Sequence, residues 1–384
     1  MKKVQSRRKF IIKSIFGAIP LFLLGISSYG KAIRKPFLHL SRLSNKAFMS
    51  NDIIIKTRPL GFQWETANPF LFCVHHEDFY PKGNKDFGPD ASLAGRNIVN
   101  DFEVKVGWRM YHGDTVPGFP VHPHRGFETI TVVREGFVDH ADSMGAAGRY
   151  SAGDVQWMTA GKGIQHAEMF PLLNMDKDNK LELFQIWLNL PKKDKFVDAH
   201  FKMLWADDIP IYSSEDKAVE ALVIAGSLYG IKAPASPPNS WAANPDNHVE
   251  IYTIKMKANS VWTIPADEAG LNRTLFFFQG SKLKVAGESI SDYHAIELYS
   301  NKVVELETGA EDCQLLFLQG KPIDEPVVQY GPFVMNTKAE IQQAYTDYQS
   351  TQFGGWPWDS KDPVHGKEKK RFAKHADGKM EQKV

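Results

Sequence analysis

The chain has few of the features that indicate disulfide cross-links, a membrane-spanning segment or nucleic-acid binding. Its 384 residues include only two cysteines, Cys73 and Cys313, each in an apolar, strand-like run. We expect two buried, unpaired thiols, with a disulfide in an oxidising compartment as the alternative. The apolar segment near the start, residues 14–26, is shorter than the roughly 20 residues that span a bilayer, and Pro20 interrupts it. Charges nearly balance, at a net +1, which gives no reason to expect a nucleic-acid partner.

What the sequence does have is an ordinary globular composition and many short β-type runs. Hydrophobic residues make up 43% and charged residues 24%, and the length suits two domains or one large one. Short runs separated by turn residues, with no long helical period between them, argue for a barrel or a sandwich. These runs are Val104–Trp108, Ile130–Val133, Asp154–Trp157, Leu183–Leu188, Ala221–Ile224, Glu250–Ile254, Thr274–Phe278 and Gln314–Leu318. Residues 183–191 also echo residues 315–322, which indicates two duplicated units.

Residues 1–32 are predicted to be an export signal, and residues 33–50 a linker. The stretch from Ser6 to Lys13, Ser-Arg-Arg-Lys-Phe-Ile-Ile-Lys, resembles a twin-arginine motif, and small or polar residues follow the apolar run. We therefore expect passage through the twin-arginine translocase and an extracytoplasmic location. The alternative is an uncleaved segment that tethers the chain to a membrane. No cysteine follows the apolar run, so a lipoprotein anchor is unsupported.

Two pairs of candidate metal ligands lie between residues 118 and 168. The first is His122 and His124, and the second is His166 and Glu168. Side chains at positions i and i+2 of a strand point to the same face, so two such strands in one barrel would send three imidazoles and one carboxylate inward. This donor set suits one divalent ion of iron, manganese, copper, nickel or zinc, and its oxygen ligand argues against copper(I). The alternative is two satisfied polar pairs without a metal.

The same residues carry a resemblance to the pirin family. It rests on His122-Pro-His-Arg-Gly-Phe-Glu-Thr, on Asp139-His-Ala-Asp-Ser-Met-Gly, and on the run Gly153-Asp-Val-Gln-Trp-Met-Thr-Ala-Gly-Lys-Gly-Ile-Gln-His-Ala-Glu-Met. Asn68-Pro-Phe-Leu-Phe and Gly331-Pro-Phe-Val-Met-Asn-Thr-Lys extend it over most of the chain. Pirins are bicupins, so the resemblance implies an all-β chain of two tandem cupin-type β-barrels with a C-terminal helix.

The resemblance also implies a metal site and a function. The N-terminal barrel would hold the metal through His122, His124, His166 and Glu168. Some pirins open the ring of quercetin, so we expect a metal-dependent dioxygenase with quercetin 2,3-dioxygenase-like activity. Fe(II) is the first expectation for its metal, with Ni, Cu, Mn or Zn as alternatives, and its partners would be dioxygen and a small aromatic or enediol-type substrate. The alternative is a non-catalytic, metal-dependent binding or regulatory protein.

Residues beside the ligands are candidates for catalytic and pocket roles. Glu168 is the ligand best able to release the metal and take a substrate proton. Glu128 shares the parity of the first histidine pair, so we expect it to face the metal as a hydrogen-bond partner or exchanging ligand. The candidate pocket residues are Phe119, Arg125, Gln156, Trp157 and Met158. For Trp157, a place in the core is the favoured interpretation and a place in the pocket the alternative.

Turn and charge patterns divide the chain into domains. We expect a metal-binding cupin domain at 51–195, a linker at 196–217, a second cupin domain at 218–358 and a disordered basic tail at 359–384. A closing helix is predicted within residues 336–348, with Asn336 or Thr337 as its cap.

His75 and His76 follow a predicted strand, where the resembling family has an acidic pair. Adjacent side chains of a strand face opposite ways, so both histidines cannot enter one barrel. We expect them at the surface or between the domains.

Overall fold

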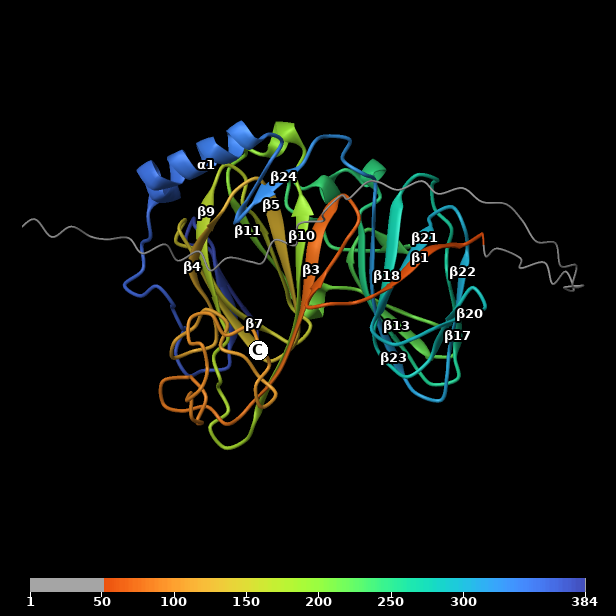
Figure 1. Ribbon diagram of the computed structural model, residues 1–384, viewed down its shortest axis with the longest axis horizontal. Coiled ribbons are helices and arrows are strands. Elements are labelled where there is room, and N and C mark those ends of the chain that lie inside the picture. The colour runs from red at the N-terminus through yellow and green to blue at the C-terminus, as the bar shows by residue number, and fades with distance from the viewer. Residues whose placement is uncertain (1–51, 384) are drawn as a thin grey trace, which may run out of the picture. The chain divides into compact units, whose positions relative to one another are not determined.

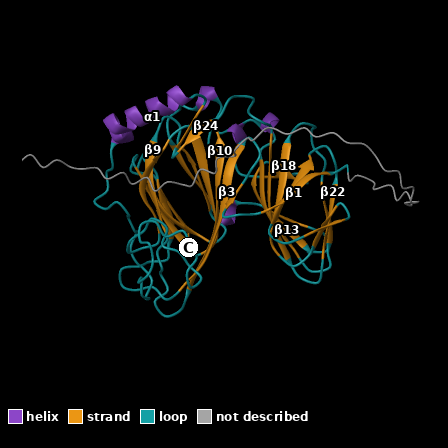
Figure 2. Cartoon of the chain, viewed as in Figure 1, coloured by secondary structure: helices purple, strands orange, loops and turns teal. Residues whose placement is uncertain are grey.

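The computed structural model describes residues 52–383, and over this range the chain is mostly β-structure, as predicted. Strands dominate the fold, and α1 (Lys338–Thr351) is the one α-helix of the described part (Figure 2). The predicted signal at 1–32 and the linker at 33–50 lie outside the described residues. Within residues 52–383, no helix is long and apolar enough to cross a membrane.

Two six-stranded sheets form the first barrel (Figure 1). One sheet contains, in order, β11 (His200–Leu204), β8 (Val155–Thr159), β5 (Phe127–Glu135), β10 (Asn179–Asn189), β3 (Phe70–Tyr80) and β2 (Gln63–Trp64). The other contains β27 (Met380–Lys383), β26 (Arg371–Lys374), β7 (Ala147–Ser151), β6 (Phe137–Asp142), β9 (Ile164–Met169) and β4 (Gly118–His124).

A seven-stranded and a four-stranded sheet form the second barrel. The larger sheet contains β1 (Ile54–Pro59), β21 (His294–Tyr299), β18 (Asn272–Gln279), β23 (Cys313–Gly320), β16 (Glu250–Met256), β13 (Val219–Ala225) and β12 (Ile211–Ser213). The smaller contains β17 (Val261–Ile264), β22 (Val304–Thr308), β19 (Leu283–Val285) and β20 (Glu288–Ile290). Two further pairs are β14 (Ser227–Leu228) with β15 (Ile231–Lys232), and β24 (Val328–Tyr330) with β25 (Phe333–Met335).

The strand order supports the repeat seen in the sequence. β10 lies between β5 and β3, and β23 takes the matching place between β18 and β16. The strands at the edges of the two sheets come from different parts of the chain. In the first barrel, β11 borders β8. In the second barrel, β1, which precedes the first barrel in the sequence, borders β21. The predicted domain start at residue 51 and the linker at 196–217 are therefore wrong in detail. β1 belongs to the second barrel, and the linker range contains β11 and β12.

A hydrophobic core joins the large sheets of the two barrels. Side chains from β5, β8 and β10 meet side chains from β16, β18 and β23 in one buried cluster. Trp64 stacks on Phe276 within it, with ring centroids 5.2 Å apart. Burying a large apolar side chain contributes roughly 1.5–3 kcal/mol, so this interface is a major source of stability. Cys73 is buried in the same cluster, and Cys313 is buried in the core of the second barrel. Both thiols are free, as predicted.

The predicted closing helix is confirmed as α1. Thr337 is its N-cap and forms a capping box with Glu340, a reciprocal pair of hydrogen bonds that satisfies the first backbone donors. Ile341 and Ala344 are buried against β25. Asp347 of α1 binds the Arg125 guanidinium, 2.6 Å away, so the helix is fastened to the turn that follows β4.

The predicted disordered tail is wrong for residues 359–383. β26 pairs with β7, and β27 pairs with β26, so the tail extends the first barrel's second sheet. Before β26, the chain passes over that sheet, where Val121 N–H donates to the Lys361 carbonyl, 2.7 Å away. Arg371 pairs with the fully buried Asp154. The basic composition that indicated disorder instead provides partners for buried carboxylates of the barrel.

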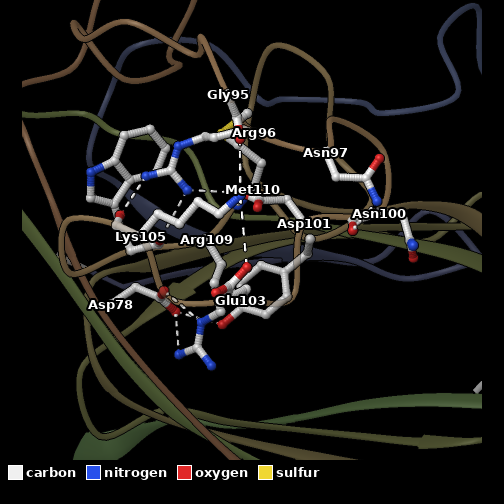
Figure 3. A network of polar contacts seen from close by, with 12 residues as sticks. Asp78, Gly95, Arg96, Asn97, Asn100, Asp101, Glu103, Lys105, Arg109 and Met110 are labelled. Carbon is white, nitrogen blue, oxygen red and sulfur yellow. Dashed lines mark hydrogen bonds and ion pairs between the residues drawn. The ribbon is translucent and has the colours of Figure 1, made fainter. Parts of the chain in front are cut away.

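The long connection between β3 and β4, residues 81–117, is fixed by buried charges. Figure 3 shows Arg96 binding Asp101 (2.8 Å) and Arg109 binding Asp78 (2.9 Å). The Arg96 guanidinium also lies over the Trp108 ring. Because each buried charge is paired, the connection holds a defined shape beside the start of β4.

The buried carboxyl of Glu128 makes the barrel interface sensitive to pH. It accepts hydrogen bonds from Thr159 of β8 and from Ser240, which lies in the second domain between β15 and β16. Burial raises the pKa of Glu128 from 4.5 to about 7. The folded state therefore binds this proton more tightly than the unfolded state. Stability from this group is present below pH 4.5 and is lost as the pH rises through 7, by on the order of 3 kcal/mol.

We predict that Glu128→Gln removes this loss of stability at rising pH. Urea denaturation at pH 5 and pH 8 should show a smaller decrease in the free energy of unfolding for the variant than for the wild type. Glu220→Gln, at an exposed position of β13, is the control and should follow the wild type. Parallel profiles for Glu128→Gln and the wild type would contradict the assignment.

Candidate metal centre

The pairing of β4 with β9 brings three predicted ligands together. His122 is the register partner of His166. His124, two residues further along β4, lies on the same face, so its ring centroid is 4.8 Å from that of His166 and 4.7 Å from that of His122. One ring nitrogen from each of the three lies within 4.8 Å of the others, a spacing that suits one metal ion. The alternation rule therefore predicted this arrangement correctly.

Backbone carbonyls hold two of the rings in a ligand orientation. His122 Nδ1–H donates to the Pro120 carbonyl at 2.9 Å. His124 Nδ1 makes a longer contact of 3.4 Å with the carbonyl of Pro332, between β24 and β25. Both contacts assign the proton to Nδ1 and leave the Nε2 lone pair for a metal, the arrangement typical of metal-binding histidines. His166 is fully buried, and neither of its ring nitrogens has a hydrogen-bond partner. A buried imidazole without a hydrogen-bond partner fits the role of a metal ligand.

Burial keeps the triad uncharged. It lowers the pKa of His122 to about 4 and those of His124 and His166 well below 6.5, and the neighbouring imidazoles add to the effect. Neutral imidazole is the form that binds metals. The three residues are therefore ready to coordinate without first losing a proton at neutral pH.

The structure does not bring Glu168 into the triad. Its carboxylate accepts hydrogen bonds from Thr131 Oγ1 (2.9 Å), Gln185 Nε2 (3.1 Å) and Tyr150 OH (3.3 Å). Burial raises the pKa of Glu168. The three imidazoles form the cluster, whereas the carboxylate of Glu168 is held by donors from neighbouring strands, and its role as the fourth ligand stays a prediction.

Two predictions about the residues around the ligands are wrong. Glu128 faces the second domain rather than the triad, because Gly126, with a φ of 86°, breaks the parity between β4 and β5. A side chain at Gly126 would collide with the Val334 carbonyl, so only glycine fits there. Arg125 points away to Asp347 and the Lys162 carbonyl. Trp157 lies in the core between the barrels, which was the favoured of its two interpretations.

The other candidate pocket residues lie within the first barrel rather than in the core between the barrels. Phe119 is half-buried, and its ring centroid is 6.3 Å from that of His122. Met158 packs on Ile164 of β9. Gln156 is fully buried, and its amide has no partner.

His75 and His76 face opposite ways, as predicted, but both are buried rather than at the surface. His75 contacts Phe278 of the second barrel, with ring centroids 5.1 Å apart, so its expected place between the domains is confirmed. His76 bonds Tyr111 inside the first barrel, at 2.8 Å.

Sequence reasoning missed four residues that support the site. Thr131, Tyr150 and Gln185 hold Glu168, and the Pro332 carbonyl contacts His124. Thr131 and Gln185 are polar residues within otherwise apolar strand runs, and this pattern could have identified them. Nothing local connects Pro332 to a histidine more than 200 positions earlier.

We predict that His124→Ala abolishes metal retention. Removing one of three ligands leaves two imidazoles, too few to hold a divalent ion through gel filtration. Metal analysis of the purified protein should show about one equivalent in the wild type. His294→Ala, at the first residue of β21, should retain the metal, because that imidazole bonds the Asp292 carbonyl just before its own strand. Equal metal content in His124→Ala and the wild type would exclude the triad as the site.

Comparisons with known proteins agree with this architecture. A pirin family model matches residues 96–188, and a model of the pirin C-terminal cupin domain matches residues 251–354. Pirin-1 of Arabidopsis thaliana is 37% identical over 239 residues, which cover 62% of this chain and 78% of that protein. A Pseudomonas aeruginosa protein with the provisional name quercetin 2,3-dioxygenase is 37% identical over 237 residues, which cover 62% of this chain and 79% of that one.

Among solved structures, a quercetin 2,3-dioxygenase from Acinetobacter baumannii aligns with a TM-score of 0.62 and 25% identity, over 79% of this chain and 98% of that one. With both domains matched and most of each relative covered, this chain belongs to the pirin family of bicupins.

Proposed function

We propose that the protein is a metal-dependent dioxygenase with quercetin 2,3-dioxygenase-like activity. The observation that carries the proposal is the triad of His122, His124 and His166, in which the fully buried His166 has no partner for either ring nitrogen. The name of the Acinetobacter relative supports this reaction class. The proposed metal is Fe(II), with Ni, Cu, Mn and Zn as alternatives that the same imidazoles accept.

A metal bound to the triad would supply a Lewis-acid and redox centre with positions open for a chelating substrate and dioxygen. The chain's own residues would orient and shield it. Phe127 and Trp187 pack beside His124, with ring centroids 5.0 and 5.2 Å from the imidazole, and exclude water from that side. His122 is only half-buried, so substrate would approach past it and Phe119.

Glu168 has two proposed roles: fourth ligand and acceptor of the substrate hydroxyl proton at its carboxylate. Either role requires it to exchange hydrogen bonds that it now accepts from Thr131, Tyr150 and Gln185. These donors would then hold the carboxylate at a fixed distance from the triad, which makes them positioning residues.

The second candidate is a metal-dependent binding protein without turnover. It is favoured by the position of Glu168 outside the triad, since the histidines alone suffice for metal binding but do not supply a proton acceptor.

We predict that metal-loaded wild-type protein consumes dioxygen when quercetin is added. His124→Ala should lower the rate at least roughly hundred-fold, since loss of second-shell support alone lowers activity by up to that factor. His294→Ala should retain the wild-type rate. An oxygen electrode measures all three. Bound metal without oxygen uptake would contradict the enzyme and favour the binding protein.

We also propose export by the twin-arginine pathway, from the sequence of residues 6–26. A folded protein can receive its metal before crossing the membrane, which protects a site that would otherwise bind the commoner wrong ion. Replacing both Arg7 and Arg8 by Lys should leave the protein inside the cell, as fractionation with immunoblotting would show. Unchanged extracytoplasmic recovery would contradict the assignment of the signal.

A further inference from the structure

Four side chains inside the first barrel have buried polar atoms without hydrogen-bond partners. They are Thr129 (Oγ1), His140 (Nδ1), Gln156 (both amide atoms) and His166 (both ring nitrogens). Each side chain is fully buried. An unsatisfied buried polar atom destabilises a protein by about 1–3 kcal/mol, and native structures contain few. A metal accounts for one ring nitrogen of His166 but does not account for the amide of Gln156.

The strand register relates Gln156 to the residues that hold Glu168. Gln156 on β8 and Gln185 on β10 flank the same residue of β5, Thr131, on opposite sides. Thr131 bonds Glu168, so Gln156 lies one strand away from the partner of the glutamate, on the same face of the sheet.

The other two groups lie closer to the histidines. Thr129 precedes Thr131 by two residues on the same face and is the register partner of Trp187, whose ring lies 5.2 Å from that of His124. The His140 ring centroid is 5.5 Å from that of His166.

The two glutamines that flank Thr131 differ in one respect. Gln185 Oε1 shares the single hydroxyl proton of Thr131 with Glu168, and Gln185 Nε2 donates to Glu168 at 3.1 Å, so the amide is engaged at both ends. Gln156, with the same side chain and the same neighbour in the sheet, uses neither end. The amide of Gln185 forms hydrogen bonds within the protein, whereas the amide of Gln156 is available for a ligand.

We propose that Gln156, together with Thr129, forms a substrate-binding subsite beside the metal triad. The inference rests on the proposed function and specifies how the site selects its substrate. A carboxamide presents an N–H donor next to a carbonyl acceptor. It therefore matches a ligand edge on which a carbonyl and a hydroxyl group are adjacent. The threonine hydroxyl and His140 Nδ1 add donors or acceptors on the neighbouring strands. The substrate class is thus an enediol or α-hydroxy carbonyl compound, including flavonols, rather than a hydrocarbon aromatic.

The first test uses the metal-free full-length protein. Gln156→Leu replaces an unsatisfied buried amide with an apolar side chain of similar size, so the unfolding temperature should stay the same or rise. Gln185→Leu is the matched control and should lower it, because Thr131 and Glu168 lose their partner. A lower unfolding temperature for Gln156→Leu, comparable to that of Gln185→Leu, would show that the amide is satisfied by the protein or by a buried water, and would overturn the proposal.

The second test uses zinc-loaded protein, which is redox-inert, so that binding is measured without turnover. Quercetin affinity, followed by tryptophan fluorescence quenching, should fall roughly ten- to hundred-fold in Gln156→Leu. It should fall in the same direction in Thr129→Val, which removes only the hydroxyl group. Zinc content should be unchanged in both variants, because neither residue belongs to the triad.

The outcomes separate the subsite from the proposed function. Normal quercetin binding by both variants would overturn the subsite and leave the dioxygenase proposal standing. Weakened binding in the variants, together with a wild-type protein that consumes no dioxygen, would support the subsite and contradict the dioxygenase. Failure of the zinc-loaded wild type to bind quercetin would overturn the assigned substrate class.

Discussion

The antiparallel register between β4 and β9 is the constraint on which the site depends. It sets His122 opposite His166, and the two-residue period of the strand then adds His124. A shift by one residue would turn every side chain of β4 to the other face and disperse the triad. Much of the surrounding structure secures this register. The Lys361 carbonyl binds Val121 within β4, and the turn after β4 is fastened to α1 through Arg125 and Asp347.

Gathering three imidazoles away from water opposes folding, and the energy that offsets it comes from elsewhere in the molecule. The orphaned nitrogens of His166 and the raised pKa of Glu168 both reflect desolvation. The apolar cluster between the barrels and the paired charges of the connection at 81–117 contribute stability without taking part in the site. This division explains why the second barrel is needed although the triad lies in the first. Its strands β13, β16, β18, β21 and β23 supply apolar side chains to the cluster against which the ligand barrel packs.

The sequence predicted what depends on local periodicity and failed where distant segments meet. The His-x-His pair and the capping box of α1 follow from spacing within one element, and both are present as expected. Glu128 was predicted on the wrong face because the alternation of side-chain faces along β4 does not continue across Gly126, whose φ is positive. Glu168 was placed in the triad because its neighbours Thr131 and Gln185, on other strands, could not be seen to compete for it. The tail was misread because a basic, polar composition says nothing about a buried partner such as Asp154. β1 was predicted in the wrong barrel for a related reason, since its partner β21 lies more than 200 residues later in the sequence.

The connection of β26 to β7 has a consequence for the order in which the protein is made. The sheet that contains β4 and β9 gains this strand only after residue 374 has left the ribosome, when the second barrel has already been synthesised. Domains usually fold in the order of their translation. Here the earlier barrel is finished last, and the edge beside β7 stays open until then. The sheet edge beside β7 is therefore covered only after the second barrel has been made, although the triad lies in strands that are synthesised before it.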